Sequence, residues 1–152
     1  MPPISIMQPK KFEYLPHTAD IMFAAYGRDR AEVVENAAAA LLNVMLDTGK
    51  IRRSGGAQRR LKITEKADTM ENLVWYVLQD ILTRVDEKAL GAFEFRVSSL
   101  KERNGKLETS GILSYKSKTE GCFLTEVKAV TPYGMEFRKA GKGYKMQVVL
   151  DV

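Results

Sequence analysis

Apolar side chains recur at helical spacing over residues 73–85, and this stripe constrains the fold more than any other feature of the chain. Its members are Leu73, Val74, Val77, Leu78, Ile81, Leu82 and Val85. A stripe this wide predicts a helix that is buried on one side along its whole length. We place its start at Asp68, because the pattern DTME sets an aspartate cap three residues before a glutamate.

A second helix is predicted to begin after Asp29. The pattern DRAE repeats the capping device, with Asp29 accepting from a backbone amide and Glu32 reaching back. Apolar residues then recur at helical spacing, namely Val34, Ala37, Ala38, Leu41 and Met45. Gly49 is the expected stop.

Extended segments surround these two helices. Residues 11–15 and 20–26 read as strands before the first helix, and RLKIT, residues 60–64, as a short strand before the second. A run of about five strands follows the second helix. It consists of FEFRV, KLETSGILSY, EVKAV, GMEFRK and YKMQVVLDV. Asn104-Gly105 is a strong hairpin signal, and Gly111 suggests a bulge or bend.

This order predicts an α+β fold in one domain. Strands that gather after the helices favour two helices packed on a largely antiparallel sheet. We assign residues 11–152 to that domain, because 152 residues suit one domain. Residues 1–10 contain three prolines and are expected to form a flexible arm.

Composition limits the compartment. A single cysteine, Cys122, excludes a disulfide within the chain and a cysteine-rich zinc site. The first residues, MPPISIMQPKK, lack the apolar core of a secretory signal, and the longest apolar run, AAAALL, is too short to cross a bilayer. We expect a cytoplasmic protein without membrane contact.

The chain is modestly basic, with a formal net charge of +5. Such a charge permits contact with RNA or an acidic protein surface without requiring either. Residues 50–60, KIRRSGGAQRR, are expected to form an exposed loop that carries Arg52, Arg53, Arg59 and Arg60. These arginines can contact phosphates. We favour the alternative, a solvated loop.

The stretch FEYLPHTADIM holds the only histidine, His17, three residues before Asp20. An extended run breaks at Pro16, and the two polar residues follow at once. They form either part of a functional site or a polar turn. One histidine is insufficient for a typical zinc site.

The end of the chain brings two carboxylates together. In the final strand Tyr144, Met146, Val148 and Leu150 share one face, which leaves Asp151 on the more polar face. Val152 then carries the α-carboxylate. Adjacent carboxylates repel, so a fixed terminus calls for a positive partner, either a basic side chain or a hard cation. Asp20 is a candidate third carboxylate if the terminal strands are neighbours. A frayed, solvated tail is the alternative.

The motifs HTAD near the start, EVKA and a terminal LDV resemble the archease family in order and spacing over residues 11–152. The resemblance implies a small accessory protein of tRNA splicing, not itself an enzyme. Its partner would be an RtcB-type RNA ligase that uses GTP and a divalent metal. The accessory protein would promote guanylylation of that ligase and its repeated turnover, touching tRNA only indirectly or weakly.

The resemblance also implies a metal site. Its ligands match Asp20, Asp151 and the main-chain carboxylate of Val152, and calcium is favoured, with magnesium or manganese as alternatives. Lys128 of EVKA matches a basic position that looks functional in the family, and Asp47 after the first helix falls where some members carry an acidic residue close to the site. His17 would orient Asp20 or a strand end. These three residues would support the site or contact the ligase. The chain departs from the family at Pro132-Tyr133, where many members have Tyr-His.

Two other functions stay open on the sequence. One is a basic RNA-binding or chaperone module built on the Arg52–Arg60 loop. The other is a stand-alone metallohydrolase using Asp20, Asp151 and His17. The chain lacks a glycine-rich phosphate loop of sufficient length, which disfavours the hydrolase.

Overall fold

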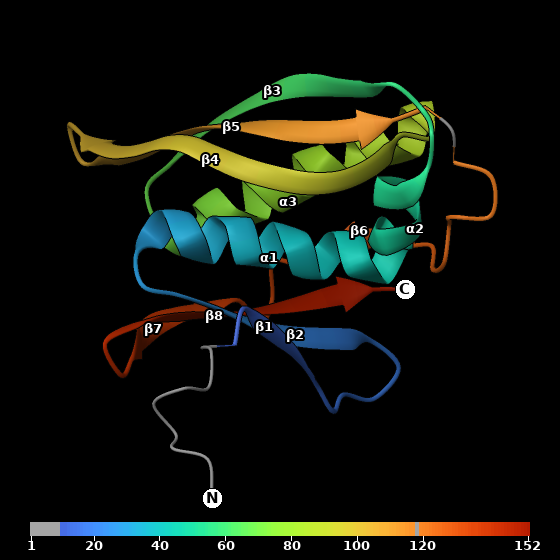
Figure 1. Ribbon diagram of the computed structural model, residues 1–152. Helices are drawn as coiled ribbons and strands as arrows, with labels where there is room; N and C mark the ends of the chain where they lie inside the picture. The colour runs from blue at the N-terminus through green and yellow to red at the C-terminus, as the bar shows by residue number, and fades with distance from the viewer. Residues whose placement is uncertain (1–9, 118) are drawn as a thin grey trace, which may run out of the picture.

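The computed structural model describes residues 10–117 and 119–152, and two long helices lie between two antiparallel sheets (Figure 1). The strands are β1 (Phe12–Leu15), β2 (Ile21–Gly27), β3 (Gln58–Ala67), β4 (Gly91–Arg103), β5 (Lys106–Lys116), β6 (Ala129–Val130), β7 (Glu136–Ala140) and β8 (Gly143–Asp151). The helices are α1 (Arg30–Met45), α2 (Thr48–Arg53) and α3 (Met70–Lys88). The predicted α+β class with antiparallel pairing is confirmed. The predicted arm, residues 1–10, lies outside the described residues except for Lys10.

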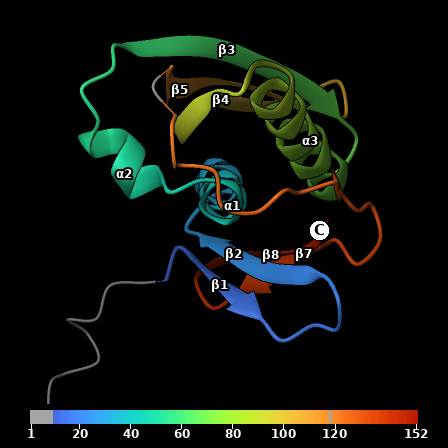
Figure 2. The ribbon, with the colours of Figure 1, turned by 90° about the vertical axis from the view of Figure 1, so that its right-hand side faces the viewer.

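The strands divide between two sheets, whereas the order of elements along the chain suggested one. One sheet has the order β1-β2-β8-β6, with β7 also paired to β8, and the other has the order β3-β5-β4. Figure 2 shows α1 end-on between these two layers. The physical reason lies in α1, which buries nine side chains distributed around its circumference. A helix that is apolar on most sides must be covered on both faces.

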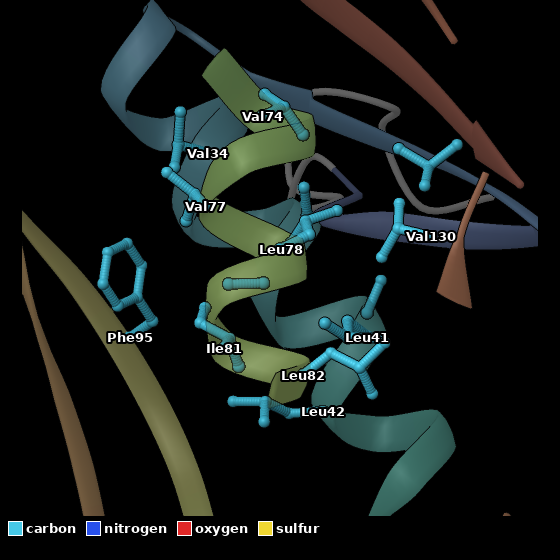
Figure 3. Close-up of a cluster of buried hydrophobic side chains, with 14 of the residues drawn as sticks. Val34, Leu41, Leu42, Val74, Val77, Leu78, Ile81, Leu82, Phe95 and Val130 are labelled. Carbon is cyan, nitrogen blue, oxygen red and sulfur yellow. The ribbon is translucent and has the colours of Figure 1, made fainter. Parts of the chain in front are cut away.

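The main core fills the space between α1 and α3 (Figure 3). All seven members of the stripe over residues 73–85 are buried, each with at most 1% of its surface exposed. They meet Val34, Leu41 and Leu42 of α1, with Phe95 of β4 on one side and Val130 of β6 on the other. The stripe is therefore buried along its whole length, as its spacing predicts.

The helix ends partly match the predicted caps. Asp29 caps α1 and accepts from the amide of Glu32 at 2.9 Å. The cap of α3 is Thr69, which accepts from the amide of Asn72, so the assignment of Asp68 as cap is wrong by one residue. Asp68 instead pairs with Lys106 across the gap to β5. A threonine hydroxyl satisfies the same orphan amide that an aspartate would.

The segment after α1 differs more from its prediction. The helix ends at Met45, and Asp47 caps a further short helix, α2, that contains Gly49 and Arg52. The predicted exposed loop over residues 50–60 is therefore wrong in its first part. Ile51 is fully buried and fixes α2 against the core. β3 then starts at Gln58 and is twice as long as the predicted five residues.

The hairpin predicted at Asn104-Gly105 joins β4 and β5. Both residues have positive φ, 53° and 75°, as a type I′ turn requires. Gly111 is not itself bulged. The irregularities lie on β4, between Ala92 and Glu94 and between Val97 and Ser99, and Gly111 faces the second of these. Among residues 10–117 and 119–152, no helix combines the length and apolarity needed to cross a membrane.

Candidate functional site

The HTAD segment forms the connection between β1 and β2. The amide of Asp20 donates to the carbonyl of Thr18 at 2.8 Å, and Ala19 adopts a left-handed φ of 68°. A non-glycine residue in this region is uncommon and costs free energy, so the surrounding fold fixes this turn. The turn directly precedes β2 and fixes the backbone of Asp20 at the start of that strand.

Asp20 and Asp151 come to the same end of one sheet because β2 and β8 pair antiparallel. Ile21 is opposite Leu150, and Asp20 and Asp151 are the next residues beyond this pair, Asp20 in the turn and Asp151 in β8. Both side chains are half-buried. The expectation that the two terminal strands are neighbours is thus correct, with β1 at the edge and β2 against β8.

β6 adds the EVKA motif to the same sheet end. Ala129 pairs with Asp151, and the amide of Lys128 donates to the carbonyl of Asp151 at 2.8 Å. The Lys128 side chain is exposed. Val152 follows Asp151 directly and is half-buried against the core. Four of the predicted site residues, Asp20, Lys128, Asp151 and Val152, therefore gather at one end of one sheet.

His17 lies close to the same group. Its Nδ1 atom is 3.7 Å from Oδ2 of Asp20, and about a third of each side chain is exposed. This separation is longer than a hydrogen bond. The two side chains therefore attract each other only through their charges, which requires a protonated imidazole. The proposed role of His17 in orienting Asp20 stays a prediction.

Asp47 has a different task in this fold. Its Oδ1 atom accepts from the amide of Lys50 at 3.0 Å, and its own amide donates to the carbonyl of Cys122 at 2.8 Å. It therefore caps α2 and ties the start of that helix to the loop before β6. A contact between Asp47 and the paired carboxylates stays a prediction.

The residues at this sheet end suit a hard cation. Two aspartates and the main-chain oxygens of Val152 offer the oxygen donors that Ca²⁺ and Mg²⁺ prefer. Among residues 10–117 and 119–152, histidine, cysteine, aspartate and glutamate side chains form no group of three that could hold a metal. A cation here would therefore depend on the main-chain carboxyl group of Val152 as its third ligand.

A cavity of about 550 Å³ opens beside His17 and Asp20, and the sequence did not reveal it. It lies between the HTAD turn and the C-terminal end of α1, and Leu124 forms part of its wall. Leu124 is 59% exposed and its neighbour Phe123 is 49% exposed. The available signal in the sequence was this pair of adjacent large apolar residues, which lies outside every predicted helix and strand.

The four arginines assigned to one loop are separated by the fold. Arg52 and Arg53 belong to α2, whereas Arg59 and Arg60 belong to β3, where neighbours point to opposite faces. Arg52 is also committed to local contacts. It donates to the carbonyl of Phe93 at 2.9 Å and lies 3.5 Å from the Glu94 carboxylate. The four arginines therefore belong to two different elements and not to one loop.

Comparison with known proteins agrees with the order of these motifs. The model of the Archease protein family (MTH1598/TM1083) matches residues 12–152. A protein archease of Methanosarcina barkeri is 42% identical over 147 residues, which is 95% of this chain and 98% of that protein. One from Methanosarcina acetivorans is 39% identical over 148 residues, with 95% and 98% covered.

Solved structures give the same result. The solution structure of Methanobacterium thermoautotrophicum protein 1598 superposes with a TM-score of 0.77 at 34% identity, covering 93% of this chain and 99% of that one. The crystal structure of an archease, described as a possible chaperone, from Thermotoga maritima shares the fold with a TM-score of 0.57 at 20% identity, covering 97% and 98%. The family match over nearly all of the described residues and the identity of these relatives lead to one conclusion: this chain belongs to the archease family.

Proposed function

We propose that this protein is an accessory activator of an RtcB-type, GTP-dependent RNA ligase in tRNA splicing, and that it is not itself a catalyst. The observation that carries the proposal is the pairing of β2 with β8, which brings Asp20 of HTAD and Asp151 of the terminal LDV to the same end of one ladder, each next to the Ile21–Leu150 pair. Two motifs from opposite ends of the chain thereby make one acidic tip. Membership of the archease family supports the same function.

In this proposal Asp20, Asp151 and the main-chain carboxyl group of Val152 hold a divalent cation, with calcium favoured over magnesium and manganese. A bound divalent ion stabilises charge that develops on phosphate oxygens. The role of this chain is to hold the carboxylates in place. The Ala19 turn fixes Asp20, and the bond from the Lys128 amide to the Asp151 carbonyl fixes the strand end.

Exposed apolar surface next to these carboxylates supports contact with a partner protein. Leu124 and Phe123 expose apolar surface beside the cavity that Asp20 lines. Large exposed apolar groups next to a charged site are typical of protein contact surfaces. We assign this rim to contact with the ligase, around the mouth of its active site.

The experiment is RNA ligation by an RtcB-type ligase at limiting concentration, with and without this protein, counting joined RNA per ligase. We expect about one turnover alone and many with the protein. Asp20→Asn should abolish the gain, whereas Glu87→Gln, an exposed carboxylate on α3, should leave it intact. An unchanged turnover number with the wild-type protein would reject the proposal.

The same assay tests the non-catalytic role. The protein without ligase is expected to join no RNA and to consume no GTP. Release of phosphate or joined RNA by the protein alone would instead support the metallohydrolase built on Asp20, Asp151 and His17. The RNA module built on residues 52–60 has less support, since those arginines are separated as described above.

A further inference from the structure

The outer face of the β3-β5-β4 sheet is open. Both long helices pack against its inner face, where α1 contacts β4 and α3 contacts β3 and β5. Figure 1 shows the two long helices on one side of this sheet. On the opposite side α2 covers one end, where Lys116 is 8% exposed and donates to the carbonyls of Arg52 and Ser54. In the described part of the chain, the rest of that side carries exposed residues. This face belongs to the sheet that lies across the helices from the sheet end with Asp20 and Asp151.

The open face is strongly basic. Side chains alternate along β3, with Leu61, Ile63, Glu65 and Ala67 turned inward and Arg60, Lys62, Thr64 and Lys66 exposed on the other face. The strand register extends this pattern across β5 and β4. The outward cations are Arg60, Lys62, Lys66, Arg96, Lys101, Arg103 and Lys106, and the outward carboxylates are Glu94 and Glu108.

A β-bulge makes this charge distribution. Arg96 is opposite Ile112, and the register then shifts between Val97 and Ser99. Without the shift, Lys101 would share the inward face with Val97, because the side-chain period of a strand is two. With it, Lys101 is opposite Glu108 and joins Arg96 on the outer face.

Only part of the positive charge is neutralised within the sheet. Lys66 pairs with Glu108 at 3.2 Å, and Arg96 lies 3.4 Å from Glu94. Among the described residues, Arg60, Lys62 and Lys101 form no ion pair, although all three are exposed. The middle of the face therefore offers cations without local partners.

A row of hydroxyl groups crosses the same face. Ser110 of β5 is opposite Thr64 of β3 and opposite Ser99 of β4. Lys62 and Arg96 flank this row on one side, and Lys66 and Lys101 flank it on the other. Hydroxyls between two rows of cations suit a ligand that carries both phosphates and hydroxyls.

We propose that this outer face binds the phosphate backbone of double-stranded RNA without regard to base sequence. Lysine and arginine neutralise phosphates, and 2′-hydroxyl contacts accompany them in duplex RNA recognition. The outward positions of the described strands carry no exposed aromatic side chain on which an unpaired base could stack, because Phe93, in the bulge between Ala92 and Glu94, is 8% exposed and lies under Arg52 and Lys116. Single-strand binders depend on such stacking, so a duplex is the ligand that this face fits.

The test uses the full-length protein and a fluorescent RNA duplex of roughly 20 base pairs, a little longer than one double-stranded RNA module spans. Binding is followed by anisotropy at several salt concentrations. The triple variant Arg60→Gln, Lys62→Gln, Lys101→Gln is compared with a matched control, Arg138→Gln, Lys139→Gln, Lys142→Gln. The control removes the same number of exposed charges from the β7–β8 hairpin of the other sheet.

We expect the outer-face variant to bind the duplex at least about tenfold more weakly, and its log K against log salt slope to fall by about three. The control should bind within about twofold of wild type, and shuffling the duplex sequence should change nothing. Equal losses in the two variants, absence of wild-type binding at low salt, or tighter binding of single-stranded RNA would each overturn the proposal. So would binding to vesicles of anionic lipid without binding to the duplex.

The measurement needs no ligase, so its result is separate from the activator function. A protein that activates the ligase but ignores the duplex would retain the first proposal and lose this one. Circular dichroism of both triple variants checks that the sheet is intact.

Discussion

Asp20 and Asp151 lie at the same end of the β2–β8 ladder, each next to its last pair, Ile21 and Leu150, although they come from opposite ends of the sequence. The ladder that unites them is buried in its middle, where Phe23 is opposite Val148 and both are fully buried. A buried ladder therefore fixes the backbone that leads to both carboxylates. This arrangement suits a preorganised cation site better than a solvated tail.

Removal of one carboxylate should abolish stabilisation by a divalent ion. A ligand that binds only the folded state at about 100 times its Kd stabilises by about 2.7 kcal/mol. We expect Ca²⁺ to raise the Tm of the wild type and to leave that of Asp151→Asn unchanged. Thermal unfolding with Ca²⁺ and with a chelator measures both.

The same variant has an opposite effect without the ion. Asp151→Asn removes one of two neighbouring charges, so in chelator it should be at least as stable as the wild type. Glu87→Gln serves as the charge-matched control and should keep the full Ca²⁺ shift. A normal shift in Asp151→Asn would count against the ligand assignment.

The stability of the fold should fall as the pH rises through neutrality, because of Glu65. Burial, with a bond to the Asp80 carboxyl as the second cause, raises the pKa of Glu65 from 4.5 to about 7, while Arg84 acts in the opposite direction. A carboxyl with a raised pKa binds its proton more tightly in the folded state. Its contribution is therefore fully present below about 4.5 and lost as the pH passes about 7.

Glu65→Gln keeps the neutral side chain at every pH and should remove this dependence. Because Glu65 is half-buried and partly screened, we expect a gain of about 1 kcal/mol at pH 8 and little change at pH 5. Urea unfolding at both values measures the difference. Parallel pH profiles for the variant and the wild type would show that Glu65 titrates normally.

Gly111 should be intolerant of any side chain. A Cβ atom there would overlap the Phe95 ring and lie 2.8 Å from the carbonyl of Arg96. We expect Gly111→Ala to lower the free energy of unfolding by about 2–4 kcal/mol, because the backbone of β4 at Arg96 cannot move far enough to make room for the new atom. Gly55→Ala, where nothing lies within 4 Å of the new atom, should change it by less than about 0.5 kcal/mol. Equal effects at the two positions would refute this account.

Trp75 should stabilise β6 through a hydrogen bond. Its Nε1 atom donates to the carbonyl of Val130 at 2.7 Å, and Gln79 accepts from the amide of the same residue at 3.1 Å. Trp75→Phe leaves that carbonyl unpaired and should cost about 1–3 kcal/mol. Hydrogen exchange should also speed up in β6. Tyr76→Phe, at a 41% exposed position, should alter neither quantity.

Local signals predicted the elements that depend on neighbours in sequence. The stripe over residues 73–85, the cap at Asp29 and the hairpin at Asn104-Gly105 all follow from contacts within a few residues. Where two local devices compete, the sequence is ambiguous. Asp68 and Thr69 are both good caps, and the pairing of Asp68 with Lys106, distant in sequence, accompanies capping by Thr69.

The amino-acid sequence by itself determined the α+β class, the apolar faces of the helices and the three motifs that mark the family, because these depend on periodicity and spacing. Only the tertiary structure decided that the strands form two sheets and that the pairing of β2 with β8 brings Asp20 and Asp151 to the same sheet end. It also divided the arginines of residues 52–60 between α2 and β3. It also decided which face of the β3-β5-β4 sheet is open and basic, through a bulge that depends on strand register. Strand partners and register are set by long-range burial, which no local pattern in the chain encodes.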